Sequence, residues 1–486
     1  MVVGGEAASG EAAEVRSDVT SNAIVEAFVR PVVIIPPIMT TAATHDFSPP
    51  HRSPFVRLSF MMFLQYAVWG IWLPILAKYF ATPVEGGGLG FTSGQIGWIL
   101  GLAGSIGAVS APFIAGQLAD RIMNAERALG LMLIAGAFVK FAMTNQTSYG
   151  AWMGLSILYS VFYMPTLSLS NSVAFAHLSD REKQFPPIRM WGTIGWIVAS
   201  VAFPLYYMKT GIHFTTSWPF VDGAARPDEV SQIKYAMLVG GVISLAYGVY
   251  CFFLPATPPT KDARRPIAFA AAFKLLTQPR VIALLIAALL VSMIHQVYFF
   301  RTPSYLTDAI GLPAGDIGST MAIGQVSEIV FLAILGLFLK RIGYKWIIIL
   351  GALSYAARYA IFAMVPSAGV VKLAMLLHGM NYGFFFAGSF LFVERISPKD
   401  IRHSTQIVFG IIILGVGPVL AGAYNEWLST FVRHSPAPEA FSSIGVAFDY
   451  RKIWAIQAAI AFVAAVIMLV GFPSRVKTHD DSISTA

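Results

Sequence analysis

Glu328 and Gln325 lie one helical turn apart inside an apolar run, residues 316–339. An ionisable side chain in such a run is costly to bury, so a carboxylate there needs a partner or a function. A carboxyl group removed from water can bind and release a proton near neutral pH, and the neighbouring amide can hold a polar solute. The two residues predict a proton-linked solute site, unless Glu328 only neutralises a nearby cation such as Arg358.

A second polar set lies in the run 187–208. Arg189, Thr193 and Trp196 occupy positions i, i+4 and i+7, which places them on one stripe of a helix. A guanidinium, a hydroxyl and an aromatic face are the partners of a solute that has hydroxyl groups, carbonyl groups and a flat ring. The alternative for Arg189 is a long side chain that reaches toward water from near the helix end.

Two further runs carry isolated polar groups. Gln296 lies in 281–304, and His378 and Tyr382 share a face of 370–395 together with Asn381. Imidazole titrates near physiological pH, so His378 is a second candidate proton carrier. A stripe of Gln65, Trp69 and Trp72 on the first apolar run is a weaker candidate for the same site, and packing is the alternative for its tryptophans.

Long apolar runs must position these side chains. The chain of 486 residues is 56% hydrophobic and 12% charged, and the runs are long enough to span a bilayer. We expect an all-α polytopic membrane protein with about twelve transmembrane helices in two six-helix repeats. The expected spans are 56–80, 94–117, 128–145, 149–175, 187–208, 233–254, 281–304, 316–339, 345–365, 370–395, 404–428 and 453–472.

These spans divide the chain into five parts. We expect a disordered N-terminal tail at 1–52, an N-terminal bundle at 53–254, a cytoplasmic linker at 255–280, a C-terminal bundle at 281–473 and a cytoplasmic tail at 474–486. Residues 267–276 of the linker predict a short amphipathic helix at the membrane surface. The stretch 23–39 lacks the basic start, apolar core and cleavage site of a signal peptide.

The basic residues indicate an orientation rather than a partner. The net charge is +8, but the lysines and arginines gather in short loops on one side of the predicted spans, so we expect no nucleic acid. By the positive-inside rule both termini are cytoplasmic. A short basic turn after a glycine occurs in both halves, as Gly116-Gln-Leu-Ala-Asp120-Arg121 and Gly336-Leu-Phe-Leu-Lys340-Arg341. Such an internal repeat is typical of secondary transporters, whose substrate binds between the repeats.

The repeat plan and the Asp120-Arg121 turn resemble the major facilitator superfamily. Four strings are similar to the nucleoside:proton symporter family of bacterial nucleoside permeases: Tyr163-Met-Pro-Thr-Leu167, Phe185-Pro-Pro-Ile-Arg-Met-Trp-Gly-Thr-Ile-Gly195, Gln325-Val-Ser-Glu328 and Phe392-Val-Glu394. The resemblance implies nucleoside import across the bacterial cytoplasmic (inner) membrane by alternating access, in a monomer. It also implies no cofactor and no metal.

The same resemblance assigns roles to residues. It places Arg189, Thr193, Trp196, Gln296, Gln325, Glu328, His378 and Tyr382 at the substrate. It gives Asp120, Arg121 and Glu394 to gating. Gly383 stands where the family permeases carry an aspartate that is linked to proton coupling, and Phe299 stands at a family asparagine. Proton coupling by Glu328 alone, proton coupling by His378, and uncoupled transport all remain open, and an aspartate at 383 would steepen the pH dependence if it faced the substrate.

Other functions fit the sequence less well. A transporter for another polar solute, such as a sugar or a nucleobase, is the alternative within the fold. The sequence has no Walker loop, dinucleotide fingerprint, zinc-spaced His/Cys set or nucleophile elbow, which disfavours an ATP-driven pump and a membrane enzyme. The tails are too short for the output domain of a sensor. The base preference does not follow from the sequence.

Overall fold

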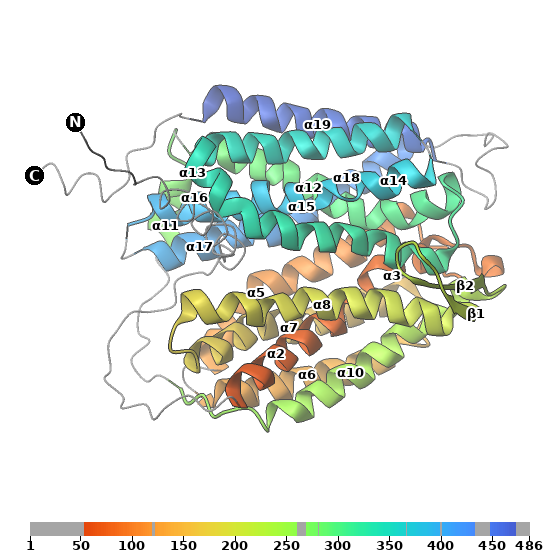
Figure 1. The fold of residues 1–486 in the computed structure, drawn as a ribbon, viewed down its shortest axis with the longest axis horizontal. Coiled ribbons are helices and arrows are strands. Elements are labelled where there is room, and N and C mark those ends of the chain that lie inside the picture. The colour runs from red at the N-terminus through yellow and green to blue at the C-terminus, as the bar shows by residue number, and fades with distance from the viewer. Residues whose placement is uncertain are drawn as a thin grey trace, which may run out of the picture.

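The computed structural model describes residues 53–118, 122–259, 269–279, 281–365, 367–398, 401–432 and 448–472. Long helices run side by side, with the first half of the chain on one side and the second half on the other (Figure 1). One end of the bundle carries a β-hairpin and is called the hairpin end. The other end, called the linker end, carries the helix α11 (Phe269–Leu276) between the halves.

The first half contains six crossings. Its elements are α2 (Ser53–Gly70), α3 (Leu73–Ala81), η1 (Val84–Gly86), α4 (Ser93–Gly97), η2 (Trp98–Ala103), α5 (Gly104–Gln117), α6 (Ala125–Met143), α7 (Tyr149–Ala176), α8 (Arg181–Tyr207), β1 (Lys209–Phe214), β2 (Val221–Ala225), α9 (Glu229–Gln232) and α10 (Tyr235–Cys251). The strands β1 and β2 pair antiparallel.

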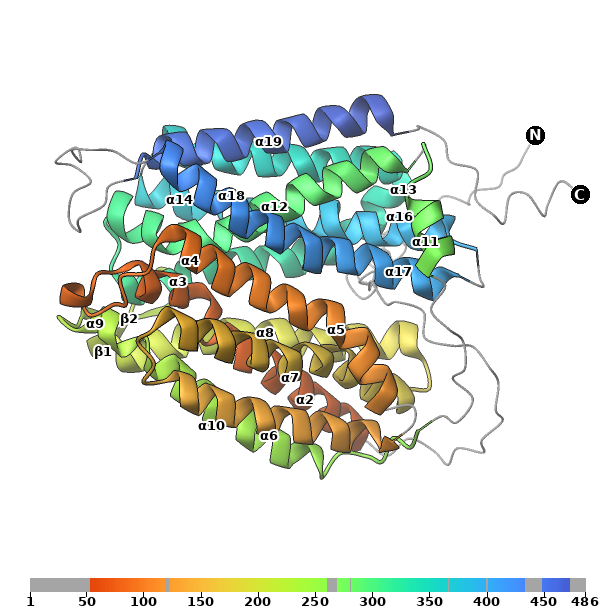
Figure 2. The same cartoon turned by 180° about the vertical axis from the view of Figure 1, so that it is seen from behind.

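The second half repeats this plan. Its elements after α11 are α12 (Ile282–Ser304), η4 (Tyr305–Ala309), η5 (Ala314–Asp316), α13 (Ile317–Met364), α14 (Ala368–Ala374), α15 (Leu377–Met380), η6 (Asn381–Ala387), α16 (Gly388–Ile396), α17 (Arg402–Ile411), η7 (Ile412–Val416), α18 (Gly417–Phe431) and α19 (Tyr450–Gly471). In the view from behind, α4 and α5 lie alongside α17 and α18 of this half (Figure 2).

The twelve predicted spans are confirmed. Ten helical segments of the described residues are long and apolar enough to cross a bilayer. One of them, 314–364, turns back at Gly343, whose φ of 74° is a left-handed conformation that favours glycine, so it crosses twice. The helix α6 adds the last crossing, although Glu126, Arg127 and Lys140 make it less apolar than the others. The predicted linker helix is also present, as α11.

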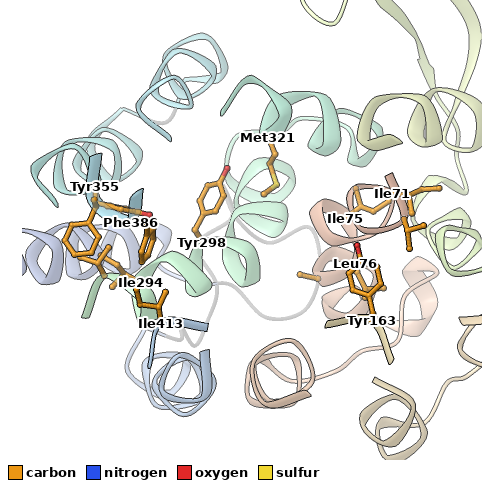
Figure 3. Packing of buried hydrophobic residues seen from close by; sticks show 14 of the residues in the cluster. Ile71, Ile75, Leu76, Tyr163, Ile294, Tyr298, Met321, Tyr355, Phe386 and Ile413 are labelled. Carbon is orange, nitrogen blue, oxygen red and sulfur yellow. The ribbon is translucent and has the colours of Figure 1, made fainter. Parts of the chain in front are cut away.

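Buried apolar side chains of the two halves form one continuous cluster. Figure 3 shows Ile71, Ile75, Leu76 and Tyr163 on helices of the first half, and Ile294, Tyr298, Met321, Tyr355, Phe386 and Ile413 on helices of the second half. All of these side chains are buried.

A buried lysine stabilises a break in the first span. Pro74 lacks an N–H group, and the chain is not helical between α2 and α3. Trp72 N–H donates to Trp69 O, which leaves the carbonyl of Val68 for the side chain of Lys140, at 3.1 Å. The Lys140 ammonium lies 5.3 Å and 4.9 Å from the ring centroids of Trp72 and Tyr159. These contacts explain how a fully buried cation is tolerated there.

Candidate substrate site between the two halves

The helices α8 and α13, which carry Arg189 and Glu328, pack against each other from opposite halves. The guanidinium of Arg189 is the charge that acts on the Glu328 carboxylate, and both charges act on the hydroxyl of Tyr382 in η6. Arg189 also lies 4.0 Å from the ring centroid of Tyr66 in α2. All four side chains are partly exposed although they lie within long spans. The arrangement provides a guanidinium, a carboxylate and two phenols between the halves.

Arg358, the alternative partner of Glu328, instead contacts other residues of its own half. Arg358 donates through Nη1 to Nδ1 of His378, at 2.8 Å, and through Nη2 to the hydroxyl of Tyr359, at 3.2 Å. Its guanidinium also lies 4.3 Å from the ring centroid of Tyr298. Arg358 is fully buried in this cage, so the cation that faces Glu328 is Arg189. The Arg189 guanidinium lies over the ring of Tyr66 and is partly exposed.

His378 lies between Arg358 and Gln325. Its Nε2 is 3.2 Å from the side-chain amide of Gln325, and its side chain is only 2% exposed. We expected His378 to contact the substrate, but its ring is instead occupied on both nitrogens. Protonation of Nδ1 would place two cations 2.8 Å apart, so the geometry disfavours His378 as a proton carrier.

His295 is a polar member of this region that the sequence reasoning missed. Its Nδ1 is 2.7 Å from the hydroxyl of Tyr355, and its ring stacks on His378 at 5.7 Å between centroids. The edges of Phe299 and Phe386 also contact it. The sequence contains a signal for His295, because it is a polar residue in an apolar run, directly before Gln296.

Gln296 bridges the two halves at a second point. Its Nε2 lies 3.5 Å from the carbonyl of Leu100, which is a long hydrogen bond. Leu100 belongs to the π-helical turn η2, where the normal helical bonding pattern is interrupted. Gln296 is partly exposed, as is Thr193 on α8. Thr193 lies one turn beyond Arg189 on the same stripe of α8.

Trp196 is not available for stacking. Its side chain is 6% exposed, and a Cβ added at Gly70 would lie 2.8 Å from its Cγ. The ring therefore fills the close crossing of α8 with α2. The sequence placed Trp196 on the same stripe as Arg189, but helix packing covers its end of that stripe. Gln65 is likewise buried, and its amide is held by Thr166 and Tyr247 within the first half.

The predicted gating residues have different outcomes. Asp120 and Arg121 lie outside the described residues. Glu394 of α16 faces Arg402 of α17, which belongs to the same half. The gating role of Glu394 stays a prediction.

Charged contacts between the halves gather instead at the hairpin end. Lys78 of α3 donates to Asp308 of η4 at 2.6 Å, and the Tyr450 hydroxyl donates to the other oxygen of Asp308 at 3.1 Å. Lys209 of β1 donates to both Asp222 of β2 and Asp316 of η5. Each of the two lysines thus ties the first half to the second.

Glu229 adds a contact of another kind. Its two carboxylate oxygens accept the backbone N–H groups of Ala314 and Gly315, both at 2.9 Å. These N–H groups begin η5 just before α13, where a negative charge is favourable. We refer to Lys78, Lys209, Glu229 and their partners as the hairpin-end lock.

Close backbone packing completes the lock. A Cβ at Gly422 of α18 would lie 2.9 Å from the carbonyl oxygen of Gly97 in α4. Asn425 of α18 also donates to the carbonyl of Ser93 at 2.7 Å, and Trp98 donates to Glu426 at 2.9 Å. Only a small residue allows this approach, as is common between membrane helices.

Gly383 faces the packing behind the site. A Cβ there would lie 3.4 Å from Cβ of Phe331, beside Leu332 of α13, and not between the halves. We therefore expect Gly383→Asp to lower stability by roughly 2.5–3.5 kcal/mol, the cost of a carboxylate in the apolar part of a span. The thermal unfolding temperature of the purified protein measures this effect.

Gly383→Ala is the matched control, because a methyl group meets only ordinary contacts at this position. It should unfold close to the parent. A Gly383→Asp protein as stable as the parent, with steeper pH dependence, would show that the side chain reaches the interface. The sequence predicts that an aspartate at 383 steepens the pH dependence only if its side chain faces the substrate. In this geometry the side chain would instead face Phe331.

Comparison with known proteins identifies the family. The model of the nucleoside H+ symporter family matches residues 53–477. The chain belongs to this family. It is 29% identical over 449 residues to the xanthosine permease of Escherichia coli K12, covering 87% of this chain and 98% of that protein. It is 26% identical over 459 residues to the nucleoside permease NupG of the same organism, covering 88% and 99%.

A solved structure supports the assignment of the fold. The crystal structure of the nucleoside transporter NupG aligns with a TM-score of 0.71 at 25% identity, over 86% of this chain and 98% of that one. A bacterial homologue of the lysosomal transporter Spinster aligns at 14% identity with a TM-score of 0.63, which shows the fold alone. The predicted major facilitator fold and the predicted family are confirmed. The chain is a multi-pass membrane transporter.

Proposed function

We propose that this symporter takes up nucleosides through the interface between its halves, with Arg189, Thr193, Gln296, Gln325, Glu328 and Tyr382 as the substrate ligands. The observation that carries the proposal is the packing of α8 against α13 across the two halves, which brings together the spans that bear Arg189 and Glu328. Both side chains are partly exposed although they lie within spans. Membership of the family and the names of the xanthosine and nucleoside permeases support nucleosides as the substrate class.

Glu328 carries the coupled proton in this proposal. While it is ionised, its carboxylate attracts Arg189 and draws the halves together. Proton uptake removes that attraction, so the affinity of the halves for each other depends on the proton. Arg189 is then free to donate to the substrate. His378 and the position of Gly383 take no part as proton carriers.

The hairpin-end lock indicates which side of the membrane the transporter is closed to. We propose that the hairpin end faces outward, as the positive-inside rule predicts, and that both termini are cytoplasmic. The structure is then closed to the outside by Lys78, Lys209 and Glu229. Transport requires these contacts to break and re-form once per cycle. The site functions within one copy of the chain, so we propose a monomer.

Uptake into proteoliposomes tests the function. We expect nucleosides to compete with radiolabelled uridine, while sugars and free nucleobases do not compete. An inward proton gradient should raise the uridine level above equilibrium. Competition by a sugar but not by nucleosides would show that the substrate is a sugar. Equal uptake with and without the gradient would support uncoupled transport.

A further inference from the structure

The contact between Arg358, His378 and Gln325 determines which end of the Gln325 amide is available to the substrate. A guanidinium has only donors, so Nδ1 of His378 must accept the hydrogen bond from Arg358. In a neutral imidazole the other nitrogen then carries the hydrogen. Nε2 of His378 is therefore a donor.

Gln325 must accept from that donor. The structure places the amide nitrogen Nε2 of Gln325 3.2 Å from Nε2 of His378, which would set two donors against each other. The oxygen and nitrogen of an amide are assigned from their hydrogen bonds, so this contact requires the Gln325 amide to be turned. Only the oxygen accepts. An imidazole that accepted at both nitrogens would be an anion, which cannot form beside a neutral amide in this apolar interior. The amide oxygen of Gln325 is thus used inside the second half.

The surrounding residues keep this chain of hydrogen bonds in one direction. Tyr298 and Tyr359 hold the guanidinium by ring and hydroxyl contacts. His295 stacks on the His378 ring, and Gly324 packs so close to the base of this ring that a methyl group at 324 would already clash, so rotation of the imidazole is restricted. The donor end of Arg358 cannot be reversed, since arginine does not lose its proton in proteins.

We propose that Arg358, acting through His378, fixes Gln325 so that its two N–H groups and not its carbonyl face the substrate. The site then requires an acceptor there, and we assign it to the carbonyl at C4 of a pyrimidine base or C6 of a purine base. Arg358 and His378 are positioning residues, and Glu328 one turn away supplies the neighbouring acceptor. This inference rests on the proposed nucleoside function and adds a selectivity to it.

Pairs of nucleosides that differ by one group test the selectivity. Uridine and inosine carry a carbonyl where cytidine and adenosine carry an amino group. We expect the parent to prefer uridine over cytidine and inosine over adenosine by about tenfold in kcat/KM, the effect of one unmatched buried hydrogen bond. The difference should arise mainly in KM.

Variants at 378 test the mechanism. His378→Phe keeps an aromatic ring but frees the Gln325 amide to turn, so the preference should fall to about one. His378→Gln should restore it, because an amide can accept from Arg358 and donate to Gln325. Tyr359→Phe is the matched control, since it removes one contact of Arg358 but leaves the contact with His378, and it should keep the parental preference.

The outcomes separate the two proposals. If the parent transports no nucleoside, the proposed function fails. If it transports nucleosides with no preference for the carbonyl, or if His378→Phe keeps the parental preference, the inference about Gln325 is wrong while the function stands. Surface expression and thermal unfolding of each variant show whether the protein is folded.

Discussion

Glu328→Gln is expected to abolish concentrative uptake while exchange of nucleosides across the membrane continues. The amide keeps the size and hydrogen-bonding capacity of the side chain but cannot bind a proton. For one proton per nucleoside, a gradient of one pH unit drives about tenfold accumulation. The variant should reach an internal concentration equal to the external one. Uptake at pH 5 to 8 should also lose its pH dependence, since the titrating group is removed.

Glu394→Gln is the matched control for this experiment. Glu394 is also a carboxylate in a span, but it faces Arg402 within its own half and lies away from Arg189. A gating contact affects the rate of transport and not the proton coupling, so replacement of Glu394 should leave the final accumulation unchanged. If a folded Glu328→Gln protein accumulates nucleosides as well as the parent, Glu328 is not part of the coupling mechanism. If both variants lose accumulation, the effect comes from removing a charge in general.

Lys209→Met should shift the protein toward a state that is open at the hairpin end. The Lys209 side chain is 3% exposed, while its partners Asp222 and Asp316 are 42% and 18% exposed. Removing one partner of a fully buried pair costs roughly 3–5 kcal/mol and of a surface pair about 0–1 kcal/mol. For this intermediate case we expect about 1–3 kcal/mol, a roughly tenfold to hundredfold change in the ratio of the two states.

Maleimide labelling measures this shift. Cys251 is the one cysteine of the chain, so a Cys251→Ser protein with Ser319→Cys carries a single reporter. Ser319 is 7% exposed, and its carbonyl accepts from Trp218 at the hairpin end. The reporter should label faster after Lys209→Met. Lys452→Met is the control, because Lys452 pairs with Asp449 inside one half, and equal rates in all three proteins would show that Lys209 does not hold the lock.

The lock should not itself respond to pH between 5 and 8. Burial opposes the charge on Lys209, but its hydrogen bonds to Asp222 and Asp316 raise its pKa above the ordinary value overall. The same contact, against the effect of burial, holds the pKa of Asp222 below its ordinary value. Lys209 stabilises the lock fully below about pH 10, and this stabilisation is lost only above its raised pKa. Asp222 stabilises the lock fully above about pH 4, and this stabilisation is lost only below its lowered pKa. Labelling of the Ser319→Cys reporter should therefore be constant over this range.

The number and placement of the spans followed from the sequence, because a bilayer imposes a length and an apolar composition that a run of residues either has or lacks. The stripe of Arg189 and the pair Gln325 and Glu328 followed from helical spacing for the same local reason. The spans and the stripes both depend on the local sequence and not on which helices are neighbours.

Only the tertiary structure decided what each polar residue contacts. The periodicity of one helix does not say which neighbour covers its stripe, so Trp196 was assigned to the substrate although α2 buries it. The position of Gly383 on the helix likewise did not reveal that Phe331 lies opposite. Arg358 and Glu328 are 30 residues apart in the sequence and were plausible partners. Packing instead gave Arg358 to His378 and brought Glu328 to Arg189 from the other half, because contacts across a helical bundle depend on how whole helices cross.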